Sequence, residues 1–404
     1  MISQKLYNLL ESFISFMQEI KKNNVRDALD KAVSSGSLRC VVGLVASKDE
    51  ILFEHAAGFR DEKKISLMYV DSILAIASCT KLITSIAALQ LVEAGIITLD
   101  DPVSKYLPRL EDLKILNSFN GQELCLVPTK ETPTIRQLMT HTSGYVYPFW
   151  NKDFFEADQN KAIKSLYAQD GCFEIPIAFE PGSRWAYGIG LDILGEVIKE
   201  VSQMSLYEYF SENIFQPLDM HDTAYQLSEE GYKRSVSMMQ RLDDSFITSK
   251  PFQPSIDSSY VKELGGEGLY STAVDFSHVL QMLLNQGSYK GHKILSDSMI
   301  DLMFSNQTGN LEIVDSISQI PSLTKDFNLS FGSKSHWGLG ITYHPEGTQF
   351  GRSKGSASGA GIFNTYYWVD RQAGHCGFFS TQLVPFFDDK VIEAYQEFES
   401  SIYS

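Results

Sequence analysis

The hydrophobic pattern is densest in residues 77–95, where apolar side chains fall on every side of a predicted helix. Large apolar residues recur at helical spacing between Leu82 and Val92, alanines fill the positions between them, and Gly95 follows as a stop signal. A helix that is apolar all round is stable only inside a protein. The pattern therefore predicts a central buried helix with Ser78 at its beginning.

Strand-like patterns lie near the two ends of the chain. β-Branched and aromatic residues dominate five short runs bounded by polar or glycine-containing turns, a pattern typical of strands. A short polar loop joins the first two runs, which predicts a hairpin, and a turn-like segment joins the last two, which predicts an antiparallel meander. The runs are 39–46, 51–58, 337–343, 361–370 and 375–383.

Helical periodicity accounts for most of the remaining sequence. Residues 24–34 and 388–402 are predicted helices near the two ends, and the middle, from 71 to about 287, is mainly helical. One patch of glycine, serine and alanine, residues 351–361, precedes the fourth strand-like run. Because the strands come from both ends, the helical middle is most simply an insertion.

These elements predict a single unit over residues 1–404 with an α+β fold. We expect an antiparallel sheet flanked by the terminal helices, with a helical subdomain beside it. Residues 1–70 and 310–404 would form the α/β subdomain, and residues 71–309 the mainly helical one. The two would share one cleft, which is the natural place for a site.

Composition narrows the possible partners and the compartment. The net charge of -16 argues against nucleic acid and anionic membranes, which bind basic surfaces, and no apolar run is long enough to span a bilayer. The segment Met1–Lys22 has the pattern of an amphipathic helix rather than of a secretory signal, because Glu11 interrupts its apolar residues. Five cysteines without a CxxC pair indicate a reduced, cytoplasmic compartment.

Candidate chemistry lies at the beginning of the buried helix. Residues three apart share a helix face, so Lys81 is expected beside the hydroxyl of Ser78. A serine becomes nucleophilic when a neighbour takes its proton, and a buried lysine can do this or hold another base in place. The same spacing at Ser259–Lys262 and Ser322–Lys325 has polar surroundings. The alternative for Ser78 is an ordinary helix cap with a solvated lysine, which the apolar helix disfavours.

Six stretches resemble the serine β-lactamase and penicillin-binding-protein superfamily. Within it, the chain is most similar to the class C β-lactamase-like esterases and transesterases, and especially to the fungal lovastatin-type acyltransferases. The order of the stretches also resembles that group, and together they extend over most of the chain. They are Ser78–Lys81, Thr134–Gly144, Phe179–Gly195, Asn213–Met220, Gly265–Asp275 and Trp337–Gly340.

The resemblance implies a catalytic role for three residues. Ser78 would be the nucleophile, Lys81 its activating partner, and Tyr187 the general base that later returns the proton to the leaving group. A phenol can serve as a base near neutral pH when an adjacent cation favours its ionised form. Without such a neighbour Tyr187 would be an ordinary half-buried aromatic residue.

The family's third motif, usually Lys-Thr-Gly, His-x-Gly or Trp-Gly-Gly, has its best match in Ala357-Ser358-Gly359-Ala360. This match lacks the basic or aromatic member. By resemblance, the N–H groups of Ala360 and Ser78 would form the oxyanion hole, with Ser358 and Gly359 as the rest of the motif.

Two departures from the family pattern indicate the substrate class. Ile189 stands where the second motif usually has asparagine, and the third motif lacks its lysine. Those groups help bind the carboxylate of a β-lactam or D-alanyl peptide, so a neutral acyl ester or thioester is the expected substrate. Aromatic residues after Gly144 would either line the cleft or pack within the subdomain, and the first is preferred because aromatic walls suit acyl chains. An acyl carrier or free donor could deliver the acyl group there to water or a small-molecule alcohol. The expected substrate-binding residues are Tyr145, Tyr147, Phe149, Trp150 and Ile189.

Other interpretations have weaker support. Gly351–Gly355 matches the Gly-x-Ser-x-Gly elbow, with Asp370 and His375 downstream, but Ser353 lies in a loop that leads into a strand, whereas an elbow needs a strand before it and a helix after it. His141 is expected to support its neighbours by hydrogen bonding. Neither a metal-spaced histidine pair nor a phosphate loop is present, so no metal or cofactor is expected. A catalytically silent binding or scaffold protein is the alternative function.

Overall fold

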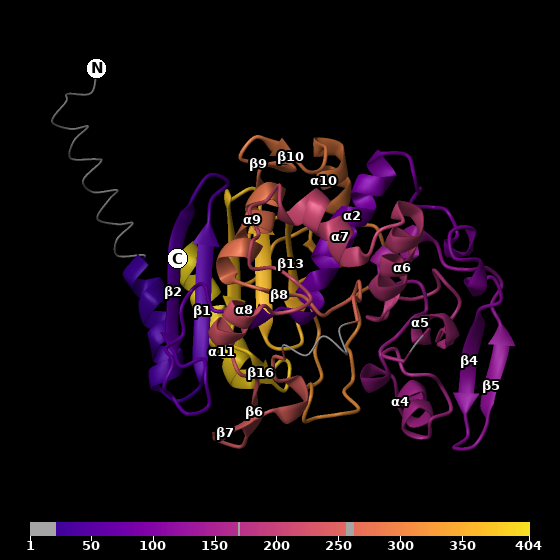
Figure 1. The fold of residues 1–404 in the computed structure, drawn as a ribbon, viewed down its shortest axis with the longest axis horizontal. Helices are drawn as coiled ribbons and strands as arrows, with labels where there is room; N and C mark the ends of the chain where they lie inside the picture. Colours follow the sequence, from indigo (N-terminus) through magenta and orange to yellow (C-terminus); the bar gives the residue numbers. More distant parts are fainter. Residues whose placement is uncertain (1–21, 169, 256–261) are drawn as a thin grey trace.

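The computed structural model describes residues 22–168, 170–255 and 262–404 (Figure 1). The helix expected over Met1–Lys22 lies outside the described residues except for Lys22, and Ser259 also lies outside them. Among the helices described, none has both the length and the apolar character needed to cross a bilayer. All five cysteines are unpaired, and only Cys125 is exposed.

A seven-stranded sheet forms the centre of the fold, in the order β11-β12-β13-β14-β15-β1-β2. Every neighbouring pair is antiparallel, and β1 lies between β2 and β15, so strands from both ends of the chain join directly (Figure 1). The expectation of an α+β fold with such a sheet is confirmed. The strands are β1 (Cys40–Ala46), β2 (Ile51–Gly58), β11 (His336–Trp337), β12 (Thr342–His344), β13 (Ser356–Gly361), β14 (Thr365–Asp370) and β15 (His375–Ser380).

The two terminal helices cover one face of this sheet. Residues 22–34 are helical, and α11 (Asp389–Tyr403) closes the chain. They meet over β1 at Gly43, where a Cβ atom would stand 2.7 Å from Leu29 and 2.8 Å from Phe398. Gly43 therefore allows both helices to pack closely on the strand.

Most of the remaining elements come from the middle of the chain. Its α-helices are α2 (Thr80–Glu93), α3 (Ile135–Met139), α4 (Lys152–Gln159), α5 (Gly171–Glu174), α6 (Gly190–Ser202), α7 (Leu206–Phe210), α8 (Glu229–Arg234), α9 (Ala273–Leu284) and α10 (Asp297–Met303). The short strands pair in small sheets, β16-β6-β7, β3-β8, β4-β5 and β9-β10. These strands are β3 (Leu74–Ala75), β4 (Lys114–Phe119), β5 (Leu124–Pro128), β6 (Met239–Leu242), β7 (Ser245–Thr248), β8 (Tyr270–Ser271), β9 (Ser288–Tyr289), β10 (His292–Lys293) and β16 (Leu383–Val384).

Helix α9 packs on the sheet and lies within the segment 71–309, which the sequence assigned to the mainly helical subdomain. The ring of Phe276 lies 5.3 Å from those of Tyr367 on β14 and Phe378 on β15, on the face opposite α11. Its apolar residues are buried against the strands. The sheet thus has helices on both faces. One of these helices, α9, comes from the segment that was assigned to the helical subdomain.

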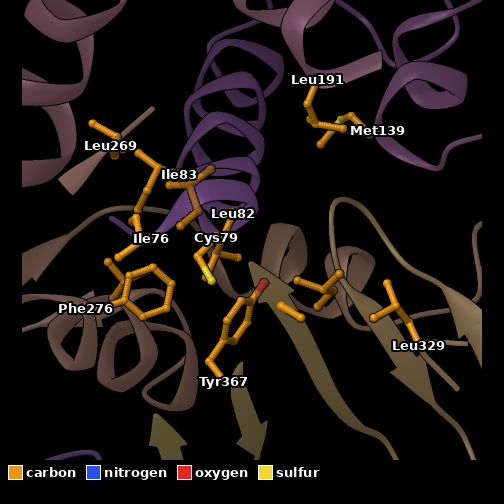
Figure 2. Close-up of a cluster of buried hydrophobic side chains, with 14 of the residues drawn as sticks. Ile76, Cys79, Leu82, Ile83, Met139, Leu191, Leu269, Phe276, Leu329 and Tyr367 are labelled. Carbon is orange, nitrogen blue, oxygen red and sulfur yellow. The ribbon is translucent and has the colours of Figure 1, made fainter. Parts of the chain in front are cut away.

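The helix predicted over 77–95 is central and buried, as expected. It begins with a 3-10 turn, η1 (Ala77–Cys79), and continues as α2, in which every residue from Thr80 to Leu89 is buried. Figure 2 shows Cys79 and Leu82 at its lower end pointing toward Tyr367 of β14. The beginning of the helix is therefore anchored to the sheet by apolar contacts.

The strand-like run 361–370 is two strands rather than one. β13 ends at Gly361, a turn follows with Asn364 at φ 58°, and β14 begins at Thr365. The glycine-rich patch is thus largely a strand itself, with small residues because space is short. A Cβ atom at Gly361 would lie 2.4 Å from the carbonyl oxygen of Ile76, and one at Gly359 would lie 2.4 Å from the hydroxyl of Tyr367.

Candidate active site

Ser78 lies in the turn η1 at the beginning of α2. Its neighbours Ala77 and Cys79 are buried, whereas Ser78 itself is only half-buried. Ala77 has φ 45°, a left-handed conformation that costs free energy in a residue other than glycine. The turn therefore holds one hydroxyl at the surface of an otherwise apolar helix.

Lys81 places a buried cation beside this hydroxyl. Its side chain is 3% exposed, and its Nζ donates to Ser78 Oγ at 3.1 Å, to Tyr147 Oη at 3.0 Å and to the carbonyl oxygen of Gly266 at 2.8 Å. An ammonium group has three N–H donors, so all of them have acceptors. This arrangement suits a protonated lysine that polarises Ser78, which leaves the role of proton acceptor to another group.

Two tyrosines flank the lysine. The rings of Tyr147 and Tyr187 stack with centroids 6.0 Å apart, and Nζ of Lys81 lies 5.2 Å and 5.1 Å from their respective centroids. Burial, with the carboxylates of Asp192 and Glu267, raises the pKa of Tyr147 well above its ordinary value. Tyr147 is thus a neutral phenol whose oxygen accepts a hydrogen bond from Lys81. The sequence had predicted only a substrate-binding role for this residue.

The segment that carries Tyr187 is held by His141. The histidine is 1% exposed, its Nδ1 accepts the Gly188 N–H at 3.3 Å, and its carbonyl accepts the Ala186 N–H at 2.9 Å. Its ring lies 4.3 Å from that of Tyr187. Burial and the nearby Lys81 lower the pKa of His141 well below its ordinary value, so it stays neutral. It supports the second motif, as the sequence suggested.

The third motif approaches Ser78 along β13. This strand contacts η1, and its pairing with β12 ends at Ser358, so the backbone from Gly359 to Gly361 continues beyond the end of β12. Ala360 lies in this stretch. Ser358 does not face the site, because its buried hydroxyl lies 2.7 Å from Nε2 of His344. Of the three predicted third-motif residues, Gly359 and Ala360 therefore lie on the open stretch, whereas Ser358 supports the strand.

An aromatic cluster adjoins the lysine. The ring of Phe149 stacks on Tyr147 at 5.0 Å, and Trp150 lies edge-on to Tyr147 at 5.5 Å and to Tyr187 at 5.6 Å. A cavity of about 110 Å³ beside Tyr147 is lined by Phe149 and Ile189 among others. Three of the five residues predicted to bind substrate, Tyr147, Phe149 and Ile189, thus line this cavity, and Trp150 packs on the two tyrosines beside Lys81.

Tyr145 is the exception among these residues. It is 1% exposed, and its hydroxyl is buried without a hydrogen-bond partner in the described part of the chain. Its backbone carbonyl packs against Gly188, where a Cβ atom would stand only 2.0 Å away. Tyr145 is therefore part of the core beneath the second motif.

Comparison with known proteins identifies the family. A sequence model of the beta-lactamase family matches residues 25–400. The chain belongs to this family. It is 30% identical to an acyltransferase of Penicillium decumbens over 78% of this chain and 77% of that protein, and 27% identical to the lovastatin esterase of Penicillium rubens over 93% and 96%. The unliganded simvastatin synthase of Aspergillus terreus superposes with a TM-score of 0.77 at 26% identity, over 94% of this chain and 97% of that one.

Ser353, the serine of the alternative Gly-x-Ser-x-Gly match, has a structural role through its backbone in this beta-lactamase-family chain. Ser353 lies in the loop before β13, and its backbone N–H donates to Oδ2 of Asp370 at 2.7 Å. The same carboxylate oxygen accepts from the hydroxyl of Tyr403 at 3.0 Å. Asp370 therefore connects the loop and α11 to the sheet by hydrogen bonds. Among the residues described, no three His, Cys, Asp or Glu side chains gather as a metal site.

Tyr147→Phe should slow acylation of the enzyme by about 10- to 100-fold, because one hydrogen bond to a buried charge is lost. The rate would be measured with an excess of a nitrophenyl ester in single-turnover mixing. Tyr145→Phe is the matched control, since it removes a buried hydroxyl without a partner among the described residues and should leave both rate and stability nearly unchanged. Equal rates for the two variants would contradict a role for Tyr147 at Lys81.

Proposed function

We propose that this chain is a serine esterase or acyltransferase that forms an acyl-enzyme on Ser78. The observation that carries the proposal is the ammonium of Lys81, which donates at once to Ser78 Oγ and to a tyrosine hydroxyl in a buried site. A serine–lysine pair with only a structural role does not need such an arrangement, whereas a nucleophilic serine needs a neighbouring group that activates its hydroxyl. The acyltransferase and esterase activities named for its relatives support the same chemistry.

Acylation would proceed through these residues in order. Ser78 Oγ attacks the carbonyl carbon of an ester or thioester, and its proton passes to Tyr187, which the Lys81 cation favours as a base. The N–H groups of Ser78 and Ala360 stabilise the oxyanion. The carbon–oxygen or carbon–sulfur bond then breaks, and Tyr187 returns the proton to the departing alcohol or thiol. Deacylation repeats these steps with water or an alcohol as nucleophile.

The substrate would be an uncharged acyl ester or thioester. Tyr147, Phe149 and Trp150 form an aromatic cluster beside the lysine, and Ile189 lines the adjoining cavity. A free thioester and one attached to an acyl carrier deliver the same carbonyl group. The unpaired cysteines support a reducing, cytoplasmic location.

Short nitrophenyl esters should be turned over at least about 100-fold faster, in kcat/KM, than a chromogenic cephalosporin. A carboxylate that enters an apolar cleft without a cationic partner loses hydration worth several kcal/mol. Hydrophobic alcohols added to the ester reaction should give new esters detectable by mass spectrometry.

Three outcomes would revise the proposal. Efficient cephalosporin turnover with negligible ester turnover would overturn the substrate class, and failure of every alcohol to intercept the acyl group would favour hydrolysis over transfer. Absence of any acyl-enzyme by intact-mass analysis would leave a binding or scaffold role.

A further inference from the structure

A buried carboxylate lies behind the proposed catalytic lysine. Asp192, in the first turn of α6, is 1% exposed. Its Oδ1 accepts the Gly266 N–H at 2.9 Å, whereas its Oδ2 is buried without a hydrogen-bond partner among the described residues. A half-satisfied buried carboxylate is costly, and such groups are retained where they have a function.

The loop at Gly265–Gly266 connects this carboxylate to Lys81. The carbonyl of Gly266 accepts from Nζ of Lys81 at 2.8 Å, and that of Gly265 accepts from Oγ1 of Thr84 at 2.6 Å. A Cβ atom at Gly266 would stand 2.3 Å from Oδ2 of Asp192. The loop therefore passes between α2 and α6 with room only for glycine at this position, and Gly266 contacts both charged residues, Asp192 through its N–H and Lys81 through its carbonyl oxygen.

We propose that Asp192 is a positioning residue for Lys81, which it acts on through Gly266. By accepting the Gly266 N–H it fixes the carbonyl that orients the ammonium toward Ser78, and its negative charge behind Lys81 compensates the buried cation. This inference rests on the proposed acyl-enzyme function and adds a residue to it.

The charge state of Asp192 is set by its surroundings. Burial raises the pKa of this carboxyl to about 7, against the opposing effect of Lys81, while Glu267 adds to the rise. Burial also raises the pKa of the tyrosines and of the cysteine around it, so these groups stay neutral near pH 7. The titratable groups that interact with Asp192 are Lys81, Tyr147, Tyr167, Cys172, Tyr225 and Glu267.

Asp192→Asn should lower the rate constant of acylation about 10- to 100-fold with KM nearly unchanged, as expected when one charge-assisted interaction is lost. In the parent protein, acylation should fall as the pH drops through about 7 and Asp192 takes up a proton, and the variant should lack this acid limb. Because the pKa of Asp192 is raised, stability falls as the pH rises from the ordinary carboxyl pKa toward about 7 and the full cost of the ionised carboxylate is present above that pH, so the variant's Tm at pH 8 should be equal or higher. A residue with a merely structural role would lose Tm and activity together.

Asp275→Asn is the matched control. Asp275 is also buried and its pKa is raised to about 6 by burial, but its Oδ2 accepts from the Asp222 N–H and from Oγ1 of Thr223, away from Lys81. This variant should keep the acid limb. Glu267→Gln, which removes the other carboxylate that raises the pKa of Asp192, should keep the limb and shift it to lower pH.

The experiment measures nitrophenyl-ester acylation from about pH 6 to 9 together with intact-mass detection of the adduct. If the parent protein forms no adduct, the proposed function fails; if it does and Asp192→Asn acylates at the parent rate with the same limb, only the present inference fails. Should Asp192→Asn not fold, the parent profile decides. A limb near pH 7 that both controls retain supports the inference, and a flat profile overturns it.

Discussion

Ser78→Ala should reduce kcat/KM toward nitrophenyl esters by about 10⁴-fold or more and eliminate the acyl adduct seen by intact-mass analysis. The substitution removes the hydroxyl that Lys81 contacts at 3.1 Å, and the two neighbouring nucleophilic groups in the sequence, the thiol of Cys79 and the hydroxyl of Thr80, are both buried. Burial raises the pKa of that thiol above its ordinary value, so it cannot substitute as a thiolate.

Ser353→Ala is the control for this prediction. Ser353 donates its backbone N–H to Asp370, and this bond survives the substitution, so the variant should label and turn over as the parent does. Labelling that survived Ser78→Ala and disappeared in Ser353→Ala would contradict the assignment of the nucleophile. Both variants should remain folded, because neither side chain is part of the apolar core.

Lys81→Met should lower the single-turnover acylation rate by about 10³- to 10⁴-fold, the scale on which members of a catalytic unit act. Methionine fills much of the volume of the lysine stem without its charge. The change leaves the acceptors of Lys81 and the buried carboxylate of Asp192 without their cation, which can lower stability by about 3–5 kcal/mol, so the rate must be measured at a temperature at which the variant is folded. A thermal melt of the same variant checks this.

The relay predicts that losses at Lys81 and Tyr187 are not additive. If the cation and the phenol act on one proton of Ser78, then Tyr187→Phe in the Lys81→Met background should cost little beyond either single change. Strictly additive losses in the double variant would show that the two residues serve separate steps. Tyr147→Phe in the same background tests whether the second tyrosine belongs to the same unit.

The sequence was sufficient for the features that depend on long patterns. A helix that is apolar on every side must be buried, so the central position of α2 followed from its residues, and the strand-like runs at the two ends predicted one shared sheet. The pairing of Ser78 with Lys81 followed from helical spacing alone.

Other features depend on contacts between segments that lie far apart in the sequence. β13 is built from serine, alanine and glycine, which have little strand preference, and its conformation reflects the close approach of Ile76 and Tyr367. The pattern gives Tyr145 and Tyr147 equal standing, although only the second reaches Lys81. Asp192 looks like an ordinary first-turn acidic residue until the Gly266 loop is placed between it and the lysine.

The position of β1 inside the sheet has a consequence for biosynthesis. β1 can pair with β2 as soon as that hairpin is translated. Its other partner is β15, in which Cys376 lies 330 residues from Ala46. At roughly 5–20 residues per second, the ribosome leaves that edge of the hairpin open for a period on the order of tens of seconds. During this time an apolar strand edge is available for wrong pairings. We expect the nascent chain to depend on chaperones that hold this hairpin, and the serine to stay inert until the last strands are complete.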